Sequence, residues 1–182
     1  MTVQNYKSKL TRGFTLIELL IVMAILGVLA VVVLVAINPV QQLARTRDAG
    51  RKAGVAQIGH AVEAYYTARG GTYPPAAGTG CTPANWLGCI VEAGELSTSP
   101  QEITYATATQ GSICTTNEVN GWCYDDTGGD MVVFSILESD SEWSKCTTGT
   151  PYFVWSSADG RGGLVCGAAA PSAGNQTFNA IQ

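Results

Sequence analysis

The sequence predicts an α+β fold in which a long N-terminal helix packs against a small antiparallel sheet. Three observations carry this prediction. Residues 14–37 form an apolar run, residues 40–69 repeat apolar side chains at helical spacing, and the rest of the 182-residue chain alternates short apolar segments with glycine-rich turns. All six cysteines follow the apolar run. We therefore expect a helix with a transmembrane half and an amphipathic half, joined to a head that disulfides staple.

The apolar run is long enough to cross a lipid bilayer. Its only polar side chains are Thr15 and Glu18, and a helix over residues 14–37 would span about 36 Å, against a hydrocarbon core of about 30 Å. The alternative is a buried helix of a soluble protein. It is disfavoured because so long a run without polar periodicity exceeds what a small core can hide.

A basic leader, residues 1–13, precedes the apolar run and ends in a glycine. A secretory signal would place its small-residue cleavage site after the apolar region, whereas Gly13 lies before it. Positive charge flanks the run on both sides, so charge alone leaves the orientation open. The cysteines favour a C-terminal region outside the cell membrane, because disulfides form in oxidising compartments.

The segment RGFTLIE, residues 12–18, followed by an apolar helix, resembles the prepilin signal of type IV pilins and pseudopilins. The resemblance implies that a membrane-embedded prepilin peptidase cuts between Gly13 and Phe14, and that Phe14 becomes the N-terminus, commonly N-methylated. Glu18 matches the glutamate that the family keeps at this offset. The implied precursor is a single-pass protein of the cytoplasmic (inner) membrane, and the implied product is an extracellular pilus after assembly.

Glu18 needs a partner, because a carboxylate near the middle of a bilayer costs about 2.5 to 3.5 kcal/mol. Cleavage after Gly13 would supply one in the free amine of Phe14, either its own, one helical turn away, or that of a neighbouring subunit. The family resemblance favours the neighbour, which makes Phe14 and Glu18 assembly residues. The alternative is an incidental glutamate that is protonated or reaches toward the lipid interface.

Asn38-Pro39 interrupts the helix, and the proline either ends the span or kinks a continuing helix. The expected segments are a transmembrane assembly helix over 14–38, an amphipathic stalk helix over 39–70 and an extracellular head over 71–182. The apolar stripe of the stalk helix consists of Leu43, Val55, Ile58, Val62, Tyr65 and Tyr66. Glycines on or beside this stripe predict close approach of a sheet or another helix. We expect His60, which lies off the stripe, on the helix surface.

The head contains four candidate strands separated by turns such as Thr127-Gly128-Gly129 and Asp159-Gly160. They are Ile103–Ala106, Met131–Leu137, Pro151–Ser156 and Gly163–Cys166. A loop rich in glycine, threonine and proline is expected over residues 76–101. The strands should form an antiparallel sheet on the C-terminal half of the helix.

The six cysteines fit disulfides rather than zinc. Their sequence separations are 8, 25, 9, 23 and 20, with no Cys-x-x-Cys, and the one histidine is not near them. Fifteen pairings of six cysteines are possible. We expect pairing between neighbours along the chain: Cys81 with Cys89, Cys114 with Cys123, and Cys146 with Cys166.

The acidic loop that carries Asp125, Asp126 and Asp130 lacks the spacing of an EF-hand. We interpret it as an ordinary turn, with calcium binding as the alternative, and expect no other cofactor. From Gly70 onward there are eleven acids against Lys145 and Arg161, a poor surface for direct nucleic-acid binding. No catalytic triad, metal-binding histidine pair or P-loop is present in the sequence, so we expect no enzyme.

These observations together indicate a structural subunit of a type IV pilus-like filament. Its expected partners are copies of itself, prepilin peptidase and the membrane assembly machinery. One alternative is a minor pilin or pseudopilin of a type II secretion or competence system, and another is a membrane-anchored surface binding module. We also expect the basic residues of the stalk to meet acidic heads of adjacent subunits; these are Arg45, Arg47, Arg51 and Lys52.

Overall fold

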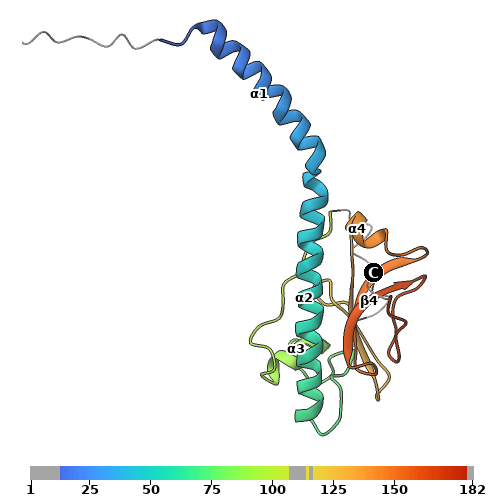
Figure 1. Ribbon diagram of the computed structural model, residues 1–182. Coiled ribbons are helices and arrows are strands. Elements are labelled where there is room, and N and C mark those ends of the chain that lie inside the picture. Colours follow the sequence, from blue (N-terminus) through green and yellow to red (C-terminus); the bar gives the residue numbers. More distant parts are fainter. Residues whose placement is uncertain (1–12, 107–113, 115–116, 180–182) are drawn as a thin grey trace, which may run out of the picture. The chain divides into compact units, whose positions relative to one another are not determined.

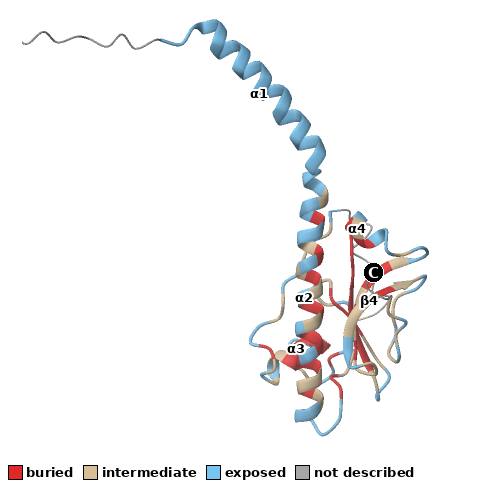
Figure 2. Ribbon diagram, viewed as in Figure 1, coloured by how far each residue is buried: buried red, intermediate tan, exposed pale blue. Residues whose placement is uncertain are grey.

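The computed structural model describes residues 13–106, 114 and 117–179, so the leader before Gly13 lies outside the described residues. The chain divides into two compact units at the Pro39–Val40 bond. The first unit contains α1, Leu16–Ile37, in which no residue is buried by the chain itself (Figure 2). Asn38 caps its C-terminus in the left-handed conformation, with φ at 45°.

The second helix begins at Pro39, where the missing N–H costs no hydrogen bond because a first-turn N–H has no helical partner. The apolar run therefore forms α1, and the amphipathic segment that follows Asn38 forms a second helix, α2 (Figure 1). The elements after α1 are α2 Pro39–Ala68, α3 Trp86–Glu92, β1 Cys123–Asp126, β2 Met131–Ile136, α4 Asp140–Trp143, β3 Thr150–Ser156 and β4 Arg161–Gly167.

The four strands form one antiparallel sheet in the order β1-β2-β3-β4, so each strand pairs with the next along the chain. Phe134 of β2 lies opposite Cys123 of β1 and Val154 of β3. The α+β fold expected from the sequence is confirmed: an N-terminal helical region precedes a small antiparallel sheet, and three disulfides join the head.

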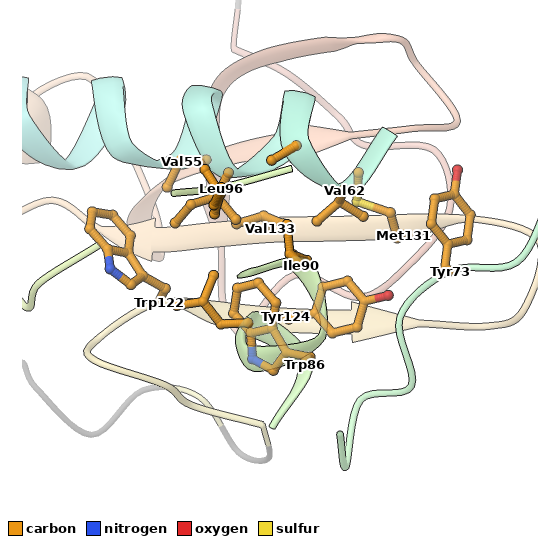
Figure 3. Close-up of a cluster of buried hydrophobic side chains, with 13 residues drawn as sticks. Val55, Val62, Tyr73, Trp86, Ile90, Leu96, Trp122, Tyr124, Met131 and Val133 are labelled. Atoms are coloured by element: carbon orange, nitrogen blue, oxygen red, sulfur yellow. The ribbon is translucent and has the colours of Figure 1, made fainter. Parts of the chain in front are cut away.

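One face of the sheet packs against α2. The core of this layer includes Val55 and Val62 from the helix, Val133 from β2 and the stacked rings of Trp86 and Tyr124, 4.8 Å apart (Figure 3). Two helix glycines make the close approach possible. A side chain at Gly54 would clash with the Trp122 ring, and one at Gly59 would clash with the Trp155 ring.

The opposite face of the sheet has its own apolar layer. The strands contribute Cys123, Val132, Phe134, Ile136, Tyr152, Val154 and Val165. The C-terminal segment covers this layer with Ala170 and Phe178, and the loop that contains Tyr105 adds a further side chain. Phe178 also pairs with Val165 in an isolated β-bridge. Both faces of the sheet are therefore covered within the chain.

The disulfides join Cys81 to Cys89, Cys114 to Cys123, and Cys146 to Cys166. This is the neighbour pairing expected from the sequence. The first connects α3 to the loop before it. The third ties the segment after α4 to β4.

Three of the four expected strands are observed, and the strand expected at Ile103–Ala106 is wrong. The backbone of this segment bonds side chains instead of a strand: the carbonyls of Ile103 and Thr104 accept from Arg51 at 3.1 and 3.2 Å, and the N–H of Ala106 donates to Glu138 at 2.9 Å. The first strand is β1, whose two aspartates resembled a turn in the sequence. The expected loop over 76–101 also contains a helix, α3.

Candidate functional site

The N-terminus of α1 is organised by a reciprocal pair of hydrogen bonds between Thr15 and Glu18. The Glu18 N–H donates to Thr15 Oγ1 at 3.2 Å, while the Thr15 N–H donates to Glu18 Oε2 at 3.0 Å. Thr15 Oγ1 also donates to the same carboxylate oxygen at 2.9 Å. This is a capping box, which satisfies two N–H groups that have no partner within the helix. The one acidic side chain of the apolar run is therefore held at the helix start.

The expected cleavage point lies just before this cap. Gly13 and Phe14 precede the first helical residue, Leu16. Phe14 is 80% exposed, and a side chain placed at Gly13 would meet no neighbouring atom within 4 Å. The Gly13–Phe14 bond is thus open to an enzyme in the chain as described. Gly13, Phe14 and Glu18 lie within six consecutive residues at the start of α1.

The surface of α1 is apolar on every side. All its large apolar residues are at least half exposed, and the described residues contain one helical stretch, beginning at Leu16, that is long and apolar enough to cross a membrane. A helix without an apolar or a polar stripe has no preferred face for a soluble core. The 22 residues of α1 extend about 33 Å, which matches the thickness of a hydrocarbon core.

Comparison with known families bears on this N-terminal segment. A family model described as the prokaryotic N-terminal methylation motif matches residues 8–34. This match supports a relationship to type IV pilins and pseudopilins. The pilin motif covers Gly13, Phe14, Glu18 and most of α1, and together with the apolar helix it fits a membrane-anchored precursor. No curated protein and no solved structure matches the chain.

The basic residues of the stalk are mostly occupied inside their own head. Arg47 pairs with Glu138, Arg51 pairs with Asp48 and Glu138, and Lys52 pairs with Glu142. The expectation that the stalk cations meet neighbouring subunits is wrong for Arg51, whose side chain is 1% exposed; for the partly exposed Arg47 and Lys52 it stays a prediction. Arg45 is exposed and forms no ion pair with any residue that the structure describes.

Arg51 is the centre of a buried charged cluster that attaches α2 to the rest of the head. Its side chain is 1% exposed and its Nη1 lies 2.9 Å from Asp48 and 3.2 Å from Glu138. The guanidinium also lies 3.8 Å from the centre of the Tyr105 ring. Asp48 in turn accepts the N–H groups of Glu138 and Ser139, at 2.9 and 2.8 Å. One helix turn thus holds the connection from β2 to α4.

Two carboxyl groups of this region are held in their charged form. Burial alone would raise the pKa of Glu138, but hydrogen bonds from Arg47 and the Ala106 N–H, with the charge of Arg51, bring that pKa below its ordinary value. Burial likewise opposes ionisation of Glu142, and its pairs with Lys52 and Lys145 lower its pKa. Both carboxylates are therefore charged at neutral pH, as their ion pairs require.

Two of the three candidate calcium ligands accept hydrogen bonds within the head. Asp125 accepts the N–H of Ala173 at 2.9 Å, and Asp126 accepts the Tyr124 hydroxyl at 3.4 Å. Burial raises the pKa of Asp126. In the described part of the chain, no group of three or more histidine, cysteine, aspartate or glutamate side chains is arranged to hold a metal ion. Calcium binding, the alternative to an ordinary turn, stays untested.

His60 lies where the sequence places it, exposed on α2, with its ring 4.2 Å from that of Trp155. The sequence interpretation missed Asp48 and Glu138, the partners of Arg51. A signal for the first was present, because Asp48 and Arg51 are opposite charges three residues apart on a helix. Glu138 had no such signal, since it meets Arg51 only through the fold.

Proposed function

We propose that this chain is the structural subunit of a type IV pilus-like filament. The observation that carries the proposal is α1: an apolar helix, exposed on all sides in the chain, with one carboxylate at its start and the methylation motif across it. The chain as described buries no residue of this helix. A membrane and then the helices of other subunits supply the apolar surroundings that it needs.

Cleavage after Gly13 turns the start of α1 into an assembly site. The new amine of Phe14 is a cation, and it lies at the N-terminus of a helix, where the helix dipole adds a partial positive charge. Both charges favour a nearby carboxylate. The Glu18 carboxylate is bound only by Thr15 among the described residues, and its side chain is exposed. In our proposal it exchanges part of this local bonding for the Phe14 amine of a neighbouring subunit, so that docking removes two uncompensated charges from the membrane.

The heads then lie on the outside of the filament, and the motif supports a structural role over a catalytic one. Prepilin peptidase and the assembly machinery of the membrane are the partners that this route requires. A minor pilin or pseudopilin would share the same processing and the same Glu18 chemistry. It would differ in abundance and in the absence of a long fibre.

The variant Gly13→Leu tests the proposal. A bulky side chain beside the scissile bond should leave the leader attached, and filaments should be lost from the fraction sheared off cells. Immunoblots of sheared and membrane fractions, with electron microscopy, measure both effects. Ala53→Leu is the control, because it places a similar bulk at an exposed position of α2, away from the cleavage site. Normal filaments from uncleaved protein would refute the proposal.

A further inference from the structure

Outside α1 and its preceding Phe14, three large apolar side chains of the described residues are exposed. Val40 is 63% exposed, Leu43 is 60% exposed and Trp143 is 38% exposed. All three lie at one end of the head. Val40 and Leu43 belong to the first turns of α2, and Trp143 belongs to α4, whose Asp140 N–H donates to Gln41 of α2 at 3.0 Å. Figure 1 shows α4 beside the N-terminal part of α2.

The exposed part of Trp143 is hydrocarbon. Its indole N–H donates to the carbonyl of Leu137 at 3.0 Å, so the polar atom of the ring is already bonded within the head. The remaining ring edge gains nothing from water. An aromatic ring placed this way is suited to the boundary between lipid headgroups and acyl chains, where tryptophan is enriched.

Charge separates this end of the head from the rest. We define the α2–α4 end as residues 40–52 and 138–146. It contains five cationic side chains and four carboxylates, whereas the rest of residues 40–182 contains two cations and nine carboxylates. The net charge of the α2–α4 end is therefore +1, against −7 for the rest of residues 40–182. An anionic bilayer surface repels the rest of the head and does not repel this end, where the exposed apolar side chains also lie.

Covalent connection brings this end to the membrane. Val40 follows Ile37, the last residue of α1, by three residues, which limits their Cα separation to about 11 Å. Leu43 lies about one helical turn further along α2. With α1 inserted as proposed above, this short connection keeps Val40 and Leu43 close to the membrane surface.

We propose that, before assembly, the α2–α4 end rests on the membrane surface with Trp143, Val40 and Leu43 at the level of the lipid headgroups. This inference rests on the proposed insertion of α1 in the membrane. The rest of the head, which carries the excess of carboxylates, then faces the aqueous side. Extraction into a filament then breaks a contact between head and lipid as well as the contact between α1 and lipid.

Quenching of tryptophan fluorescence by brominated lipids tests the contact. The full-length, processed protein is reconstituted in vesicles of phosphatidylethanolamine and phosphatidylglycerol whose acyl chains carry bromine at a shallow or a deep position. Trp86 and Trp122 are buried and Trp155 is half-buried. All three are present in both proteins, so the difference between wild type and Trp143→Phe isolates the signal of Trp143. Shallow bromines should remove most of that signal, and deep bromines should remove less.

A charge variant that keeps all four tryptophans gives a second readout. Arg45→Glu, at the α2–α4 end, should weaken shallow quenching in vesicles with phosphatidylglycerol and leave it unchanged in vesicles of phosphatidylcholine. Arg69→Glu is the matched control. Arg69 lies just after the C-terminus of α2, against the Tyr65 ring, and its replacement should change neither.

Flotation of the vesicles tests the insertion of α1 in the membrane separately from the contact of Trp143 with lipid. Protein that floats with the vesicles but shows no quenching of Trp143 would overturn this inference and leave the membrane span intact. Protein that does not float would overturn both. If Trp143 escapes quenching in vesicles and its emission shifts to shorter wavelength only in filaments, a neighbouring subunit covers it and the inference is wrong.

Discussion

α1 and α2 are consecutive helices, and they differ in how far the chain buries their side chains. α1 has no buried residue, and its one charged side chain bonds only the threonine that caps it. α2 buries ten residues. Two of them, Asp48 and Arg51, form an ion pair with each other, and Arg51 also pairs with Glu138 after β2. The difference is that α2, from Ala44 onward, buries one face within the head, whereas the chain buries no residue of α1.

The contrast also separates two uses of charge. Arg51 and its carboxylate partners fix which part of the head α2 packs against. Any other packing would leave these buried charges without partners, and an unpaired buried charge is strongly destabilising. Glu18 fixes nothing within the chain beyond its own helix start. Changes on α1 should therefore affect assembly and spare the fold of the head, and changes on α2 should do the reverse.

The largest effect expected on the assembly side comes from Glu18→Gln. Glutamine keeps the capping box, which accepts either residue at this position, and removes the charge. Since an uncompensated carboxylate in the membrane costs about 2.5 to 3.5 kcal/mol and each 1.4 kcal/mol is about tenfold, sheared filaments should fall by more than about tenfold. Quantitative immunoblots of sheared and membrane fractions measure this.

Two controls sharpen that result. Thr15→Ala removes the cap and keeps the charge, and it should cost the helix start only about 1 kcal/mol. Glu102→Gln removes an exposed carboxylate of the head and should leave filaments unchanged. If Thr15→Ala abolished filaments while Glu18→Gln did not, the cap rather than the charge would drive assembly.

On the fold side, Arg51→Met should destabilise the head by about 3 to 5 kcal/mol, because it leaves Asp48 and Glu138 buried without their cation. Urea unfolding of the full-length protein in detergent, followed by tryptophan fluorescence, measures the loss. Arg45→Met, at an exposed position of the same helix, should change the free energy of unfolding by less than about 0.5 kcal/mol. Equal effects of the two variants would contradict the buried cluster.

Replacing Cys146 and Cys166 by serine should cost about 3 kcal/mol, since the bridge closes a loop of 20 residues. Asn179 donates to the sulfur of Cys166 at 3.0 Å, so the C-terminal segment should loosen as well. Replacing Cys81 and Cys89, separated by 8 residues, should cost slightly less, about 2.5 kcal/mol by the same relation. Urea midpoints of both variants rank the two bridges, and a reversed order would contradict the loop-length argument.

The smallest effect concerns pH. Because the folded head lowers the pKa of Glu138 and Glu142 below the ordinary value of 4.5, their contribution to stability is complete above that value and is lost as the pH falls below it. The urea midpoint should therefore decline between about pH 4.5 and pH 3. Glu142→Gln should make this decline shallower, and an unchanged pH profile in that variant would show that its ion pairs contribute nothing.

Much of this architecture followed from patterns along the chain. The apolar run, the prepilin-like signal and the periodicity of α2 predicted both helices, and alternation between turns located β2, β3 and β4. Leu43 was expected on the apolar stripe of α2 but is exposed, because α2 begins before the head begins to cover it. Periodicity alone does not say where that cover starts.

The missed elements have physical reasons. α3 has seven residues and depends on the Asn85 cap and the Cys81–Cys89 bridge rather than on a long apolar pattern. β1 has two aspartates at its end, and it becomes a strand by pairing with β2. Burial of Arg51 could not be read from the sequence, since a lone arginine on a helix is ordinarily solvated and only the fold brings Glu138 to it.

In the proposed function, α1 packs against the helices of other subunits in a filament after cleavage between Gly13 and Phe14. Mass spectrometry of the protein's N-terminus, in material sheared from cells and in washed membranes, tests it most directly. The account predicts abundant sheared protein that begins at Phe14 and carries an N-methyl group. Processed protein confined to membranes would assign the chain to the pseudopilins or minor pilins, and protein that retains Gly13 and the leader in both fractions would contradict the account.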